Sequence, residues 1–166
     1  MITIRLLNAD DVGPYEKLRL EALKDSPAAF GSSYEEELQL PLGKVISRLQ
    51  QSTIFGARAE DGQLIGVLGF RREARIKRAH NASLFGMHVS LHFRRHGVGG
   101  ALLDHAIQYA RELGGIRTLK LSVTATNREA TRLYLSRGFQ SYGLEPEALY
   151  IDGRYLDEEY MILMLE

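Results

Sequence analysis

The residues Arg94-Arg95-His96-Gly97-Val98-Gly99-Gly100 form a glycine-rich turn that precedes a stretch with helical periodicity. Such a turn presents unpaired backbone N–H groups and the positive end of the helix dipole at one point, which favours a phosphate. Gly97 and Gly99 allow the backbone to approach a ligand closely, while Arg94 and Arg95 add positive charge and hydrogen-bond donors. The pattern predicts an anion-binding site, although a structural glycine turn with solvated arginines is the alternative.

Two common phosphate-binding motifs do not match this turn. A P-loop would end in Gly-Lys-Ser or Gly-Lys-Thr, whereas Gly99-Gly100-Ala101 stands here, and the dinucleotide fingerprint requires a third glycine where Leu102 lies. The sequence therefore argues against a nucleotide-binding protein that uses the same turn.

Asn127 and Tyr134 are seven residues apart. On a helix with 3.6 residues per turn, this spacing returns to nearly the same face about two turns later. One ligand could therefore contact both side chains. Asparagine is also a frequent N-cap and tyrosine a frequent residue of amphipathic cores, so each has a structural explanation that is compatible with ligand contact.

The glycine-rich turn resembles the pantetheine and pyrophosphate loop of the GCN5-related N-acetyltransferases, the GNAT family. Arg94, Gly97 and Gly99 match its pattern of Arg or Gln, two residues, Gly, one residue, and Gly or Ala. In that family the preceding strand carries a bulge whose main chain binds pantetheine. Residues 85–89 occupy this position, and Gly86 suits the bulge.

A second stretch resembles the family's downstream signature, with Asn127, Ala130, Tyr134 and a closing Gly138-Phe139. The resemblance covers about residues 82–139, whereas the N-terminal half matches only in its order of elements. It implies acetyl-coenzyme A (acetyl-CoA) as co-substrate. The implied contacts with this co-substrate come from Met87, His88, Val89, Arg94, Arg95, His96, Gly97, Val98, Gly99, Gly100, Asn127 and Tyr134.

The activity that this resemblance implies is transfer of an acetyl group to a primary amine by direct attack in a ternary complex. By resemblance, the main-chain N–H near Val89 polarises the thioester carbonyl and Tyr134 acts as the general acid for the departing thiolate. The acceptor's identity does not carry over. The alternative is a non-catalytic CoA-binding sensor or scaffold, against which Tyr134 argues because such a module needs no acid beside the sulfur.

An alkyl amine has a pKa of about 10.4 and is mostly protonated at neutral pH, so the reaction needs a base or a water relay. Glu35 and Glu36, in a loop expected to border the acceptor site, and His88, on the strand beside the thioester, are the candidate bases. A glutamate run is otherwise a solvated face and a lone histidine a packed or surface residue. The acidic run Glu35-Glu36-Glu37 also favours a cationic acceptor.

His88, His92 and His96 recur at steps of four, which on one helix would suggest a metal stripe. His88 is predicted in a strand and His96 in the turn before Gly97, so the three histidines do not share one helix face. We therefore expect no metal.

Composition adds limits on the class of protein. The 166 residues include 21 basic and 21 acidic side chains, so the chain has no net positive charge that would attract nucleic acid. The chain has no cysteine, no apolar N-terminal run of signal-peptide length and no stretch long enough to span a bilayer. We expect a cytoplasmic protein without membrane contact and with one domain over residues 1–166, which the resemblance implies is a single N-acetyltransferase domain.

The hydrophobic pattern predicts an α+β protein with a mixed central sheet. The resemblance implies a single-domain GNAT-like fold, in which about four helices flank a central mixed, twisted sheet of about seven strands. The helix over 98–113 is the clearest element, Asp10 or Asp11 is expected to cap the first helix, and Asp61-Gly62 and Asp152-Gly153 predict hairpins. The last strand, residues 160–165, is expected to be buried on both faces and could support a homodimer. The predicted strands are residues 2–7, 53–59, 64–71, 82–90, 118–123, 139–144 and 160–165, and the predicted helices are 12–25, 44–51, 98–113 and 127–136, with 28–42 as a loop or short helical turn.

Overall fold

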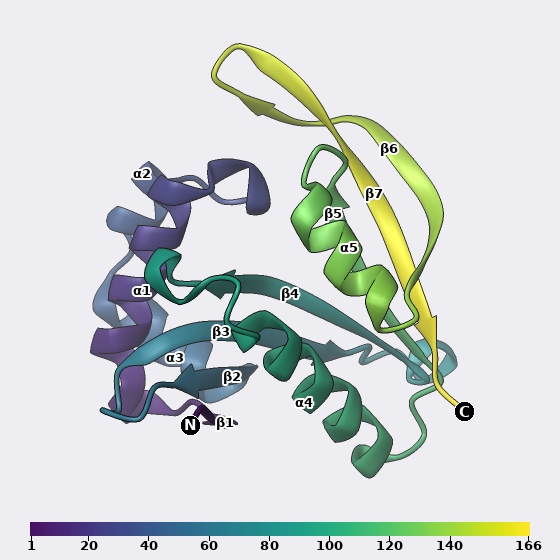
Figure 1. Ribbon diagram of the computed structural model, residues 1–166, viewed down its shortest axis with the longest axis horizontal. Helices are drawn as coiled ribbons and strands as arrows, with labels where there is room; N and C mark the ends of the chain where they lie inside the picture. Colours follow the sequence, from purple (N-terminus) through teal and green to yellow (C-terminus); the bar gives the residue numbers. More distant parts are fainter.

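The computed structural model describes residues 1–166 and places seven strands in one sheet, in the order β1-β2-β3-β4-β5-β7-β6 (Figure 1). The strands are β1 Thr3–Leu6, β2 Thr53–Arg58, β3 Leu64–Arg72, β4 Asn81–Val89, β5 Thr118–Thr124, β6 Gln140–Ile151 and β7 Arg154–Met164. The helices are α1 Val12–Asp25, α2 Tyr34–Leu38, α3 Leu42–Gln51, α4 Val98–Leu113 and α5 Arg128–Ser136.

Only β4 and β5 run parallel; every other neighbouring pair is antiparallel. Both predicted hairpins are present, and Gly62 and Gly153 have φ angles of +87° and +75°. A left-handed conformation of this kind is adopted readily only by glycine, which explains the Asp-Gly steps. The mixed α+β sheet is therefore confirmed.

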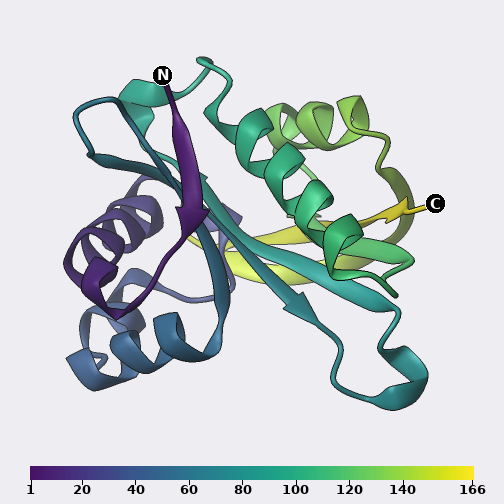
Figure 2. The same ribbon diagram turned by 90° about the horizontal axis from the view of Figure 1, so that it is seen from below.

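Each face of the sheet carries its own hydrophobic core, and helices lie on both faces (Figure 2). Helices α1 and α3 cover one face, and α4 covers the other. In α4 the buried residues Val98, Leu102, Ala106 and Ala110 recur every four positions, so one side of the helix lies on the strands. Strand β3 is buried from Leu64 to Phe70 and separates the two cores.

Three details differ from the sequence expectation. The structure has five α-helices instead of about four, because Ser33 and Glu36 form a capping box that starts α2 inside the predicted loop. Asp11 is the N-cap residue of α1, as predicted, but its side chain makes no capping hydrogen bond to that helix. It accepts the Asn8 N–H in the capping box of the preceding turn, and it accepts hydrogen bonds from arginines on β1 and β2.

Strand β7 is not buried on both faces. Met161 and Leu165 are buried in the core, whereas Met164 is 59% exposed. Alternate side chains of a strand point to opposite faces, and only one face of β7 meets the core. None of the helices combines the length and the apolar character that a membrane span needs.

Candidate active site

A cleft opens where β4 and β5 separate. The two strands pair only through Asn81–Ser83 and Thr118–Lys120, and beyond these residues they diverge (Figure 1). The cleft has a volume of about 350 Å³, within the range of about 300–1,000 Å³ that is usual for small-molecule sites. It is lined by residues 84–89 of β4, the turn and first residues of α4, the end of β5, and Asn127, Glu129, Ala130, Leu133 and Tyr134.

The predicted bulge is present in β4. Gly69 pairs with Phe85 and Val67 with His88, so Gly86 and Met87 together lie opposite a single residue of β3. Gly86 has a φ of +60°. The bulge turns Met87 toward the cleft side of the sheet and His88 toward α1.

The bulge also leaves the backbone of Val89 free to face the cleft. Ser90 N–H donates to the carbonyl of Ile65 at 2.8 Å, and hydrogen-bonded and non-bonded pairs alternate along an antiparallel ladder. Val89 and Gly66 therefore form a non-hydrogen-bonded pair, and the N–H and C=O of Val89 point away from β3. The Val89 carbonyl accepts a hydrogen bond from Arg94 Nε at 3.0 Å. The Val89 N–H points to the same side and is directed into the cleft between β4 and β5.

The glycine-rich turn delivers the N-terminus of α4 to the same cleft. Gly97 is the N-cap with a φ of +82°, and Arg95 also has a positive φ, of +62°. The Ala101 N–H donates back to the Gly97 carbonyl at 2.9 Å, so the N–H groups of residues 98–100 precede the first helical bond. Three backbone donors at the positive end of a helix dipole fit a diphosphate.

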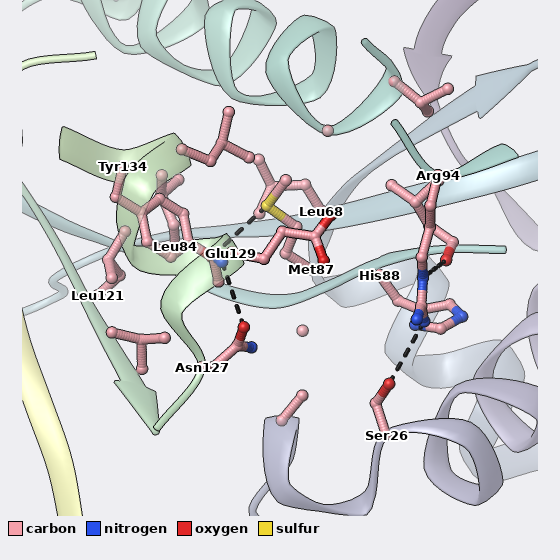
Figure 3. Close-up of a pocket in the computed structure, with 18 of the residues that line it drawn as sticks. Ser26, Leu68, Leu84, Met87, His88, Arg94, Leu121, Asn127, Glu129 and Tyr134 are labelled. Atoms are coloured by element: carbon pink, nitrogen blue, oxygen red, sulfur yellow. Dashed lines mark hydrogen bonds between the residues drawn. The ribbon is translucent and has the colours of Figure 1, made fainter. Parts of the chain in front are cut away.

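Tyr134 lies on the opposite wall of the cleft (Figure 3). Its side chain is buried, its ring packs against Phe139, and its hydroxyl lies 3.5 Å from the sulfur of Met87. Burial raises the pKa of Tyr134 to about 12, so the hydroxyl keeps its proton at neutral pH. Asn127 is the N-cap of α5, as predicted, because its Oδ1 accepts the Ala130 N–H at 3.2 Å.

A profile of the acetyltransferase (GNAT) family matches residues 16–139, which contain the cleft, α4 and α5. The chain belongs to the GNAT family. The L-amino acid N-acetyltransferase AaaT of Escherichia coli K12 is 29% identical over 101 residues, which span 61% of this chain and 62% of AaaT. The chain thus aligns with less than two thirds of that relative's length.

Solved structures share the fold of this GNAT protein over its full length. A GNAT-family acetyltransferase from Streptococcus pneumoniae has a TM-score of 0.85 at 23% identity and covers 99% of this chain and 100% of its own. The protein yncA of Salmonella typhimurium, with its cofactor acetyl-CoA, has a TM-score of 0.80 at 21% identity and covers 100% of this chain and 95% of its own.

In the glycine-rich turn of this GNAT protein, the side chains of Arg94, Arg95 and His96 have different surroundings. The guanidinium of Arg94 is held by the Val89 carbonyl, the Asp25 carboxylate and the Ser26 hydroxyl, and so ties the turn to the end of α1. Arg95 lines the cleft and is exposed. His96 is exposed, contacts the Arg94 carbonyl through Nδ1 at 2.7 Å and does not line the cleft.

Only one of the three candidate bases lies at the cleft. His88 lines the cleft, whereas Glu35 and Glu36 are exposed on α2 and do not line it. The Glu36 carboxylate accepts the Ser33 N–H at 2.9 Å, which lowers the pKa of Glu36. A carboxylate with a lowered pKa that is engaged as a helix cap is a poor proton acceptor.

His88 is 6% exposed, lies 6.2 Å from the Phe30 ring centroid, and has an Nε2 without a hydrogen-bond partner. Burial, with a smaller contribution from Arg94, lowers the pKa of His88 to about 4 against the opposing effects of Asp25 and Glu21. The imidazole is therefore neutral at pH 7.

The lowered pKa of His88 predicts that the free energy of unfolding decreases as pH falls from 6.5 to 4. In this range the unfolded chain binds a proton that the folded chain does not, since the folded pKa is about 4 and the ordinary value is 6.5. The loss should reach about 3 kcal/mol at pH 4 and be absent above pH 7. Urea unfolding at a series of pH values measures it.

Two variants complete this test. His88→Gln should lack this part of the pH dependence, whereas the exposed His92→Gln should keep it. If the free energy of unfolding changes with pH equally in wild type and His88→Gln between pH 6.5 and 4, burial does not lower the pKa of His88.

Sequence reasoning missed several cleft residues. Leu133, whose methyl lies 3.3 Å from a Cβ built on Gly99, and Glu129 occupy the helix that carries Tyr134 and could have been found from helical spacing. Ser26 and Ala29 also line the cleft, but they come from the connection after α1, and no local pattern places them there. The structure gathers no group of three His, Asp or Glu side chains that could hold a metal ion.

Proposed function

We propose that this protein transfers an acetyl group from acetyl-CoA to a primary amine by direct attack in a ternary complex. The observation that supports this most is the convergence of three features on one cleft: the Val89 N–H beside the bulge, the N-terminus of α4 and the protonated Tyr134 hydroxyl. Each matches one requirement of acyl transfer from a thioester.

Acetyl-CoA supplies the activated acyl group as a thioester. The N–H groups of residues 98–100 and the side chain of Arg95 would hold its diphosphate. The Val89 N–H would donate to the thioester carbonyl oxygen as negative charge develops there. The raised pKa of about 12 keeps the Tyr134 hydroxyl protonated at neutral pH, so it can hydrogen-bond to the sulfur as negative charge develops there. Tyr134 would give its proton to the sulfur as the carbon–sulfur bond breaks and would regain a proton from water after CoA leaves.

His88 would accept a hydrogen bond from the attacking amine or from a water molecule that carries the proton away. Its neutral imidazole and unpartnered Nε2 suit this contact, while its pKa of about 4 makes it a weak final proton acceptor. We therefore assign His88 a positioning role and bulk water the final acceptance of the proton. The cytoplasmic location, the single-domain organisation and a homodimer remain predictions.

Thermal unfolding with acetyl-CoA, ATP and NAD tests the binding part of the proposal. Acetyl-CoA should raise the Tm by several degrees, and ATP and NAD should raise it much less. A protein that acetyl-CoA does not stabilise would overturn the proposal. Thiol release with a panel of amines, amino acids, aminoglycosides and peptides tests turnover, and acetyl-CoA binding without thiol release from any of them would favour the sensor or scaffold.

A further inference from the structure

The segment of residues 25–30, here called the strap, follows α1 and lies across the opening between β4 and β5. At its start, the guanidinium of Arg94, just beyond β4, donates to the carboxylate of Asp25. Further along, the hydroxyl of Thr124, the last residue of β5, donates to the carbonyl of Ala28. Because β4 and β5 diverge toward these ends, the two contacts join the strap to opposite sides of the cleft.

The strap borders the side of the cleft from which the acceptor amine would approach. Ser26 and Ala29 line the cleft, and the ring centroid of Phe30 lies 6.2 Å from that of His88. The N-terminus of α4, to which the diphosphate is assigned, belongs to the helix on the other face of the sheet. If acetyl-CoA occupies the α4 side, the amine reaches the thioester from the side of His88 and the strap.

The hydrogen bonds of the Arg94 side chain go to the strap and to β4. Its Nε donates to the Val89 carbonyl at 3.0 Å, and its Nη2 donates to the Asp25 carboxylate and, at 3.3 Å, to the Ser26 hydroxyl (Figure 3). Turning toward a diphosphate would break these bonds, so the exchange would gain little free energy. The neighbouring Arg95 lines the cleft and is exposed, so its charge is available to the diphosphate.

The shape of the strap and the position of α1 do not depend on these two contacts. The Ala29 N–H donates to the Ser26 carbonyl at 2.9 Å and closes a short turn over Pro27–Ala29. Helix α1 is joined to the end of β4 separately, because the Ser90 hydroxyl donates to Glu21 at 3.0 Å. Loss of one contact between the strap and a strand should therefore release the strap and leave α1 in place.

We propose that the strap is the wall of the acceptor site, and that Arg94 and Thr124 are positioning residues that hold it from the two sides of the cleft. Arg94 then acts on acceptor binding through the strap and does not bind the diphosphate. Ala29, the strap residue with an apolar side chain at the cleft, limits the size of the amine that fits beside the thioester. This inference rests on the proposed acetyl transfer and adds the residues that determine acceptor binding.

Variants of the ion pair test which substrate Arg94 serves. With ethanolamine, L-lysine, spermidine and kanamycin as probes, Asp25→Asn and Arg94→Gln should each raise KM for the amine by about 10- to 100-fold and change KM for acetyl-CoA little. Arg95→Gln should do the reverse. If Arg94 bound the diphosphate, Asp25→Asn would free its guanidinium and tighten acetyl-CoA binding. That result, or equal losses of acetyl-CoA affinity in Arg94→Gln and Arg95→Gln, would overturn the inference.

The contact on the β5 side is tested without a change of charge. Thr124→Val removes the hydroxyl at similar volume and should raise KM for the amine by about 3- to 10-fold, whereas Thr124→Ser keeps the hydroxyl and should behave as wild type. Hydrogen exchange followed by mass spectrometry should be faster over the strap in Thr124→Val only, and unchanged over residues 95–103. A valine variant that exchanges and reacts like wild type would show that Thr124 does not hold the strap.

A larger side chain at Ala29 tests the strap as a wall. Ala29 is exposed and lines the cleft, so Ala29→Leu should lower kcat/KM for kanamycin about 10-fold or more relative to that for ethanolamine. Ala125→Leu is the matched control, because Ala125 is also exposed but does not line the cleft. An equal effect of Ala29→Leu on small and large amines would contradict the assignment.

Thermal unfolding with acetyl-CoA distinguishes this inference from the proposed function. Acetyl-CoA should raise the Tm of wild type, Asp25→Asn and Thr124→Val by similar amounts. If acetyl-CoA stabilises none of them and no amine is acetylated, the proposed function fails. If acetyl-CoA stabilises all three and both variants keep the wild-type KM for the amine, only the role of the strap fails.

Discussion

Replacing Gly97 with valine should abolish the stabilisation of the protein by acetyl-CoA. Gly97 is the N-cap of α4, has a φ of +82° and lines the cleft at the backbone donors assigned to the diphosphate. A β-branched residue is strained at this φ, and its side chain would stand where the diphosphate must approach. Thermal unfolding with and without acetyl-CoA should show a Tm increase for wild type and none for Gly97→Val.

Gly62→Val is the matched control for this variant. Gly62 has a φ of +87°, and a Cβ on either Gly62 or Gly97 meets nothing within 4 Å, so both substitutions impose similar backbone strain of about 1–3 kcal/mol. Gly62 lies in the β2–β3 hairpin and does not line the cleft. Both variants should lose a similar amount of Tm, while only Gly62→Val keeps the acetyl-CoA effect. If Gly97→Val binds acetyl-CoA like wild type, the diphosphate lies elsewhere.

Tyr134→Phe should lower kcat by about 10²- to 10⁴-fold, the range typical for the loss of a general acid. The substitution removes only the hydroxyl, whose recorded contact is the Met87 sulfur at 3.5 Å, while the ring can keep its packing against Phe139. Affinity for acetyl-CoA should therefore change little. Thiol release measures kcat, and calorimetric titration with acetyl-CoA measures the affinity.

The control for Tyr134 is Tyr109→Phe. Tyr109 lies on α4, packs edge-on against Phe55 and Phe70 of the sheet and does not line the cleft, so loss of its hydroxyl should leave kcat close to wild type. A Tyr134→Phe variant that loses affinity for acetyl-CoA as much as it loses turnover would show that Tyr134 is structural.

The parts of the site that the sequence predicted are those that depend on neighbours along the chain. The glycine-rich turn that starts α4, the bulge at Gly86 and the N-cap that was one explanation for Asn127 are features of a few consecutive residues, and each is present where the sequence placed it. The two hairpin turns follow for the same reason. Local backbone conformation limits which residues fit, so residue type and spacing are sufficient to locate it.

Expectations that depended on charge alone were less successful. Glu37 belongs to an acidic run and looked solvated, but α2 turns it inward between Arg19 and Arg48, which are 18 and 11 residues away. Arg94 looked free to bind phosphate, yet it is tied to Asp25, 69 residues before it. The charge of a side chain can be read from the sequence, whereas its ion-pair partner cannot.

The sequence by itself located the glycine-rich turn before α4, the bulge position and the placement of Asn127 and Tyr134 on one helix, and its resemblance indicated the family. Only the tertiary structure decided that β4 and β5 separate beyond Ser83, that Tyr134 reaches Met87, and that Arg19 and His88 meet at one cavity under α1. The reason is physical: these contacts join segments that are far apart in the chain. They exist only because two hydrophobic cores hold α1 and α4 on opposite faces of the sheet.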